Sequence, residues 1–121
     1  FRFHPRSLLR GIRLNKGYDK IKVDRKRFDS LNINIKSPCL LKIDAEGSEI
    51  YVLRGFGEKL KEIDVIQLEV SFQENFKGQS KLSELISYLE KFGFAGFIQK
   101  SLRIHNGYPN HCDLIFFKKE D

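Results

Sequence analysis

Short apolar runs alternate with segments of helical periodicity along most of this chain. Residues 39–43 and 64–72 are short and apolar, which is typical of buried strands. Residues 47–54 and 80–93 carry apolar side chains at helical spacing. Because strand–helix–strand units pair in parallel through right-handed crossovers, this alternation restricts the chain to the α/β class.

The end of the chain carries two more strand patterns with no helix between them. Residues 94–99 and 112–118 are both rich in strand-forming side chains. The loop that joins them contains Asn106 and Gly107, a pair that favours tight turns. We therefore expect these two strands to close an antiparallel hairpin.

Weaker patterns predict the remaining elements. Residues 18–27 alternate between apolar and charged side chains and predict a half-exposed strand, whereas residues 28–31 predict a short helical turn. A second short helix is expected over residues 58–63. Gly55 is expected to end the helix before it, and Ser80 to cap the helix after it.

The chain is 121 residues long, which suits a single domain spanning 1–121. It begins with Phe1 and contains no Met, which predicts an incomplete chain. No run approaches the roughly 18 apolar residues of a membrane helix, and no signal-peptide pattern opens the chain. Cys39 and Cys112 are too few for a zinc knuckle or a disulfide framework, so we expect a reduced, cytoplasmic setting.

Positive charge gathers at the start of the chain. Residues 1–27 hold ten Lys or Arg against two Asp, whereas the remainder holds twelve basic and fourteen acidic residues. A basic arm is compatible with nucleic acid, an anionic membrane surface or an acidic partner surface. No RNP-like or zinc-finger pattern accompanies it, so we expect no nucleic-acid partner. We divide the domain into a basic irregular arm, 1–20, and an α/β region, 21–119.

Three carboxylates follow the first apolar run within six residues: Asp44, Glu46 and Glu49. One interpretation is structural, because acids before and within the first turn of a helix satisfy its free amides and its dipole. The other is functional, because open α/β sheets bind ligands at the carboxyl ends of their strands. The residues alone leave both interpretations open.

Four stretches resemble the C-terminal half of the FkbM family of class I methyltransferases, which use S-adenosylmethionine. They are LLKIDAEGSEIYVLRG (40–55), DVIQLEVSF (64–72), the helical segment 80–94 and CDLIFFK (112–118). VDRKRFDSL (23–31) looks like a segment that precedes them in the family. The likeness covers residues 20–119, and its central Asp-x-Glu-Gly-x-Glu-x-x-Val-Leu-x-Gly block is specific.

The resemblance implies a fold. Residues 40–43 would be the fourth strand of a seven-stranded Rossmann-like sheet and residues 64–72 the fifth, with the last strand antiparallel beside it. The fold class is therefore α/β, a partial class I methyltransferase sheet with flanking helices. The family's glycine-rich loop after its first strand has no counterpart here, and the fourth strand would keep an unpaired edge.

The resemblance also implies site residues. Asp44 and Glu69 would be catalytic, and Asp44, Glu46 and Gly47 would contact the cofactor. Asp44 would lie beside the transferred methyl group, as a base or as an orienting group. Gly47 lets the backbone approach a ligand closely, although it also fits an ordinary loop glycine.

Other candidate residues are weaker. Asp44, Glu46 and Glu69 are the nearest analogues of the Mg²⁺-binding acids of some class I O-methyltransferases, but the family likeness requires no metal. Asp113 is expected to orient the site or to cap the hairpin. The remaining candidates are of two kinds. The histidines are expected in surface segments: His4, His105, His111. Among the aromatic residues, Phe72 is expected in the core, whereas Phe76 and Tyr108 are expected to be exposed.

The function expected from the resemblance is methyl transfer from S-adenosylmethionine to a hydroxyl on a sugar, lipid or polyketide-like acceptor. The partner would be a small molecule or glycan, and the chain alone would be inactive. One alternative is a non-catalytic remnant or an interaction domain that lacks the glycine-rich loop. Another is a metal-dependent hydrolase that uses Asp44, Glu46 and Glu69, although no histidine accompanies these acids at a useful spacing.

Overall fold

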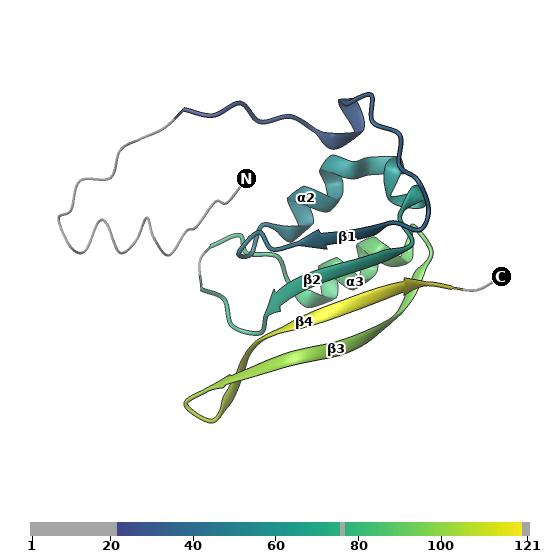
Figure 1. Ribbon diagram of the computed structural model, residues 1–121. Helices are drawn as coiled ribbons and strands as arrows, with labels where there is room; N and C mark the ends of the chain where they lie inside the picture. Colours follow the sequence, from purple (N-terminus) through teal and green to yellow (C-terminus); the bar gives the residue numbers. More distant parts are fainter. Residues whose placement is uncertain (1–21, 76, 120–121) are drawn as a thin grey trace.

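A computed structural model of the chain describes residues 22–75 and 77–119 (Figure 1). Four strands form one mixed sheet in the order β1-β2-β4-β3: β1 (Leu40–Ile43), β2 (Val65–Ser71), β3 (Phe94–His105) and β4 (Tyr108–Lys118). β1 and β2 are parallel, and β4 runs antiparallel to both β2 and β3. The predicted parallel pair and closing antiparallel hairpin are confirmed.

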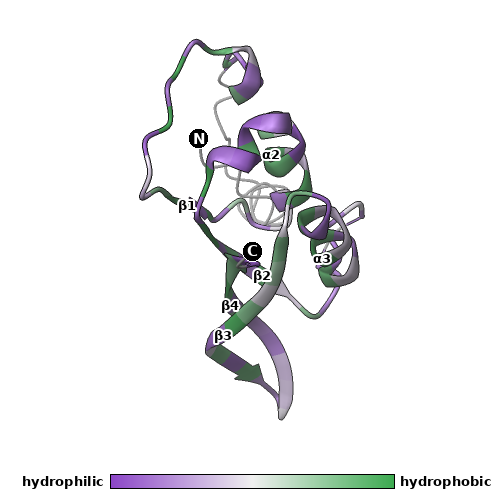
Figure 2. Cartoon of the chain, turned by 90° about the vertical axis from the view of Figure 1, so that its right-hand side faces the viewer, coloured by the Kyte–Doolittle hydropathy of each residue, from purple (hydrophilic) through white to green (hydrophobic). Residues whose placement is uncertain are grey.

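Helical segments precede and connect the strands. They are η1 (Phe28–Ser30), α2 (Glu49–Phe56), η2 (Gly57–Glu62) and α3 (Leu82–Glu90), where η marks a 3-10 helix. α2 and η2 join β1 to β2, and α3 joins β2 to β3. In the side view of Figure 2, α2 and α3 lie on the same side of the sheet. None of the helices in the described part of the chain is long and apolar enough to cross a membrane.

The helices cover one face of the sheet, and that face forms the core. Along β2 the side chains of Ile66, Leu68 and Val70 are buried, while their neighbours along the strand are only half-buried. This is the period-two pattern of a strand with one covered face. Residues of both helices complete the core: Ile50, Leu53, Phe56, Leu85, Leu89.

The opposite face of the sheet is covered by none of the described helices. It carries the alternate residues of β2 and β4, among them Gln67, Glu69 and Asp113, which are only half-buried. Apolar side chains are also exposed on it, with Ile98 at 53% and Phe117 at 39% of their full exposure. The polar residues of this face lie toward the carboxyl end of β2, where the candidate site is described below.

The hairpin of β3 and β4 is longer than the sequence predicted. The strands meet at a two-residue turn, Asn106 and Gly107, whose φ angles of 50° and 78° are those of a type I′ turn. The expected loop over residues 100–111 is therefore wrong, because the outer ends of both strands pair although they bury little (Figure 1). Tyr108 is 69% exposed, which confirms the expectation for this residue.

Two predictions near the N-terminal part of the described chain have different outcomes. The short helical turn over residues 28–31 is confirmed as η1. The strand expected over residues 18–27 is wrong for residues 22–27, which form no regular element, and residues 18–21 lie outside the described chain. Arg27 binds locally instead, with one nitrogen 2.6 Å from Asp29 and donating to the carbonyl oxygen of Arg54 at 2.9 Å.

The helix boundaries also required correction. Gly55 does not end the first long helix, which continues to Phe56 and buries that ring against Phe28 at a centroid distance of 4.1 Å. Gly57 ends it with a φ of 53°, and a Cβ there would lie 2.6 Å from the Asp29 carboxylate. The short second helix is confirmed as η2.

Asp64 fixes the start of β1 against the start of β2. Its carboxylate accepts hydrogen bonds from the Cys39 N–H at 2.6 Å and the Ser37 hydroxyl at 2.9 Å. These hydrogen bonds, with the nearby Lys118, lower the pKa of Asp64. With the two strand starts fixed in this way, Leu40 pairs with Val65 and Ile43 pairs with Leu68. This register sets where the two strands end relative to each other.

Candidate functional site

Three carboxyl groups form a row across the open face of the sheet. Glu69 in β2 pairs with Asp113 in β4. Asp44 follows directly after the last register pair of β1 and β2, Ile43 with Leu68, so it lies beside Glu69. The structure therefore brings together Asp44 and Glu69, the two residues singled out from the sequence, and adds Asp113 to them.

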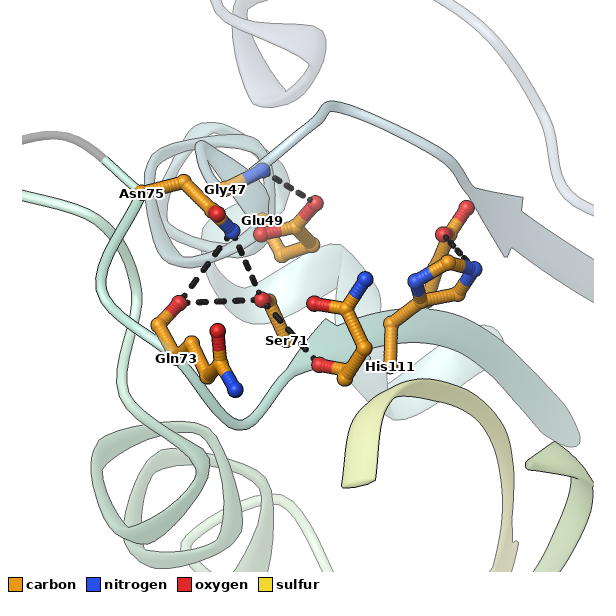
Figure 3. A network of polar contacts seen from close by, with 8 residues as sticks. Gly47, Glu49, Ser71, Gln73, Asn75 and His111 are labelled. Carbon is orange, nitrogen blue, oxygen red and sulfur yellow. Dashed lines mark hydrogen bonds and ion pairs between the residues drawn. The ribbon is translucent and has the colours of Figure 1, made fainter. Parts of the chain in front are cut away.

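Glu69 is the electrostatic centre of this row. Burial raises its pKa, and the negative charges of Asp44, Glu46 and Asp113 raise it further, as does a side-chain hydrogen bond with Asp44. Its Oε1 lies 3.4 Å from Nε2 of His111 (Figure 3). His111 was expected in a surface segment, which is wrong: it lies within β4 and is half-buried. The carboxyl group of Glu69 thus has an acid on one side and the imidazole of His111 on the other.

The loop after β1 is a tight turn in which the Ser48 N–H donates to the Ala45 carbonyl oxygen at 3.2 Å. Its central residues, Glu46 and Gly47, have φ angles of 51° and 99°. Gly47 is therefore required by backbone conformation, whereas Glu46 is strained because the left-handed region is unfavourable for a residue with a Cβ. The turn fixes the backbone that follows Asp44.

The first turn of α2 separates the roles of the acids. Asp44 does not cap the helix, since the N-cap residue is Ser48, so the structural interpretation of Asp44 is wrong. Glu49 is the first helical residue, as expected of an acid serving the helix, and its Oε1 accepts a hydrogen bond from the Gly47 N–H at 2.9 Å. Only 2% of Glu49 is exposed, and this burial raises its pKa.

The side chain of Ser80 caps the N-terminus of α2, whose N-cap residue Ser48 makes no side-chain hydrogen bond of this kind. It does not cap α3, the helix that follows Ser80 in the sequence. The sequence predicted it as the cap of α3, but α3 begins at Leu82 after an N-cap at Lys81. The Ser80 hydroxyl accepts a hydrogen bond from the Ile50 N–H at 3.0 Å and donates one to the Gly47 carbonyl oxygen at 2.8 Å. Because Ser80 follows β2, it ties the loop after β2 to the loop after β1.

The loop after β2 is held by amide side chains (Figure 3). The Asn75 side chain donates to the Ser71 hydroxyl oxygen at 2.9 Å and to the Gln73 carbonyl oxygen at 3.2 Å. Gln79 is buried, accepting from the Asn75 N–H and donating to the Gln73 carbonyl oxygen, both at 2.9 Å. The core position expected for Phe72 is wrong, because β2 ends at Ser71 and Phe72 is 44% exposed.

The acids do not form a metal site. Among residues 22–75 and 77–119, no three Asp, Glu, His or Cys side chains gather closely enough to hold a metal ion. The set Asp44, Glu46 and Glu69 named from the sequence thus lacks the required arrangement, which gives the hydrolase alternative no support. His105 is exposed near the hairpin turn, as expected, and His4 and Phe76 lie outside the described residues.

A family model for the methyltransferase FkbM domain matches residues 3–95. The chain belongs to the FkbM methyltransferase family. The family implies a Rossmann-like methyltransferase fold, in agreement with the mixed sheet described above. Searches of curated proteins and of solved structures give no significant match.

The matched range has two consequences for how the chain is divided. It begins inside the basic segment at residue 3, so most of residues 1–20 also match the family. It ends at Ala95, the second residue of β3, so the likeness noted in residues 112–118 lies outside it. The family match therefore contains β1, α2, β2 and α3. The hairpin of β3 and β4 lies almost entirely outside the match and contributes to the site through the pairing of β4 with β2.

The FkbM family implies S-adenosylmethionine as the cofactor, and the site fits one part of that molecule. The carboxyl groups of Asp44, Glu69 and Asp113 lie together at the carboxyl edge of the parallel pair, where their negative potential favours a cationic sulfonium. No strand in the described ranges is followed by a loop with repeated glycines, the usual holder of such a cofactor's far end.

Proposed function

We propose that this protein transfers a methyl group from S-adenosylmethionine to a hydroxyl of a sugar, lipid or polyketide-like acceptor. Membership of the FkbM family supports the reaction class. The observation that carries the proposal is the position of Asp44 and Glu69, side by side at the carboxyl ends of two neighbouring parallel strands. Ligands bind at this end in open α/β sheets.

When bound, S-adenosylmethionine supplies a methyl group on a positively charged sulfur. In this proposal Asp44 lies nearest the sulfonium and stabilises its charge, while Glu46 and Gly47 in the adjoining turn are further cofactor contacts. The remaining tasks are to align the acceptor oxygen and to remove its proton. The open face beside Glu69, where side chains are only half-buried, is where the acceptor would bind.

Calorimetry with S-adenosylmethionine tests the proposal, using the gene product in its full natural length. We expect saturable binding that Asp44→Ala weakens at least tenfold. Glu62→Ala, an exposed acid at the end of η2, is the matched control and should leave the affinity unchanged. Absence of binding to the wild-type protein at millimolar cofactor would overturn the proposal.

The acceptor class can be tested with cofactor labelled in its methyl group. Methyl glycosides, a glycolipid and a hydroxylated macrolactone represent the three proposed classes. We expect label to enter one of these compounds as an O-methyl group that depends on Asp44.

A non-catalytic binding domain is the alternative, favoured by the absence of a glycine-rich loop after any strand in the described part of the chain. It predicts a folded protein that fails to bind the cofactor, so the same calorimetry separates the two functions.

A further inference from the structure

His111 is held in place by both of its neighbouring strands. In the sheet register it pairs with Ser71 of β2 on one side and with Arg103 of β3 on the other. The preceding residue, Asn110, accepts a hydrogen bond from the Phe72 N–H at 2.8 Å. The imidazole projects onto the open face with 25% of the side chain exposed. It is thus fixed in position and still accessible to a ligand.

Glu69 contacts the imidazole at one of its two nitrogens. Its Oε1 lies 3.4 Å from Nε2, and within the described residues no hydrogen bond or ion pair to Nδ1 is found. A carboxylate beside Nε2 favours the tautomer in which Nε2 carries the proton. The lone pair of Nδ1 is then free to accept a proton from a ligand.

The imidazole lies on a part of the open face where most of the charged residues are acidic. Asp44 and Glu46 after β1 and Asp113 in β4 all act on the carboxyl group of Glu69, which in turn contacts the imidazole. From β3, Arg103 pairs with His111, and Lys100 pairs with Asp113. Acidic residues therefore outnumber basic ones on this part of the sheet, so a positive charge that develops on this face is stabilised.

We propose that His111 is the catalytic base that removes the acceptor's hydroxyl proton, and that Glu69 is the positioning residue behind it. The inference rests on the proposed methyl transfer and names the proton acceptor within it. The acceptor oxygen forms a bond to the methyl carbon as the carbon–sulfur bond breaks and leaves its electron pair on sulfur. The hydroxyl proton passes to Nδ1 of His111, so atoms and charges balance.

This assignment changes the role given to Asp44. An imidazole nitrogen is a stronger base than a carboxylate oxygen and so the better acceptor for a hydroxyl proton. Asp44 is also engaged with Glu69. We therefore assign Asp44 to the sulfonium and His111 to the hydroxyl, with Glu69 between the two.

Nuclear magnetic resonance of protein labelled with ¹⁵N-histidine tests the orientation without any acceptor. We expect the neutral imidazole of His111 to carry its proton on Nε2 in the wild-type protein. Glu69→Gln should lose this preference, while Glu74→Gln, an exposed acid beyond the end of β2, should keep it. A proton on Nδ1 in the neutral wild-type ring would overturn the proposal.

Kinetics with the acceptor from the labelling assay test the base itself. We expect His111→Gln to lower kcat by about 10²-fold and to remove the acid limb of the pH–rate profile. Its calorimetric affinity for S-adenosylmethionine should stay within twofold of wild type. An unchanged kcat overturns the role of His111 alone, whereas absence of cofactor binding to the wild-type protein overturns the proposed function.

Discussion

The two faces of the sheet use the same strands for opposite purposes. On the helix-covered face, Leu68 and Val70 are almost completely buried. On the open face, burial raises the pKa of the intervening Glu69, and the other acids around it raise it further. Gathering like charges is unfavourable, so it requires a backbone that cannot move away. The comparison shows that burial on one face holds the strands, while the other face carries the acids of the candidate site.

The largest difference between the faces should appear when side chains are truncated. Leu68→Ala removes a fully buried side chain of the core and should lower the free energy of unfolding by about 2–5 kcal/mol. Gln67→Ala, its neighbour on the open face, should change it by less than about 0.5 kcal/mol. Urea denaturation followed by circular dichroism measures both. Equal losses would mean that the open face is also a core.

The next effect concerns the connection between the two site loops. Ser80→Ala leaves the buried Ile50 N–H without its acceptor and should lower the free energy of unfolding by about 1–3 kcal/mol. It should also weaken cofactor binding, because the turn that contains Gly47 loses its partner. Ser83→Ala, on the exposed side of α3, is the control and should leave both quantities unchanged. A silent Ser80→Ala variant would show that the loops are held by other contacts.

A smaller effect of opposite sign is expected at Glu46. Glu46→Gly relieves the left-handed φ of 51° and should raise the free energy of unfolding by about 1 kcal/mol. The same variant should bind S-adenosylmethionine more weakly if the carboxylate contacts the cofactor. Glu62→Gly, at the end of η2, should be destabilising. A loss of stability in Glu46→Gly would mean that the side chain contributes more than its conformation costs.

The smallest effect is a dependence of stability on pH that comes from the buried carboxyl group of Glu49. Burial raises the pKa of Glu49, so its contribution to stability is greatest below the ordinary glutamate pKa and is lost as pH rises through the raised value. Glu49→Gln removes this dependence, so its stability relative to wild type should increase as pH rises from about 4.3. Denaturation of both proteins between pH 4 and 8 measures the difference. A difference that is constant over this range would contradict the burial of the charge.

Local patterns predicted most elements because their signals are contained in a few neighbouring residues. The alternation in residues 64–72 located β2 to within one residue at each end. The hairpin length was missed because residues 100–105 are all exposed, so no buried face marks them and only their pairing with β4 makes them a strand. Gly55 was misjudged because the burial of Phe56 extends the helix past it.

The same division applies to the site. Asp44 and Glu69 were singled out from the sequence because they are acids at or near the ends of apolar runs. His111 and Ser80 were missed because their partners, Glu69 and the α2 N-terminus, come from distant parts of the chain. The one signal for His111 was its place in the same alternation as Asp113, two residues later, which would have put both on one face.

The sequence by itself determined the α/β class, the two crossovers, the family and the acids at or near the ends of β1 and β2. Tertiary structure decided which of these acids meet, which residue caps α2 and where the imidazole of His111 lies. The physical reason is the distance along the chain between the residues that interact. Periodicity and turn preference act between residues that are close in sequence. The pairing of β4 with β2 joins strands that are far apart in the sequence, and only this pairing brings the imidazole of His111 to the carboxylates.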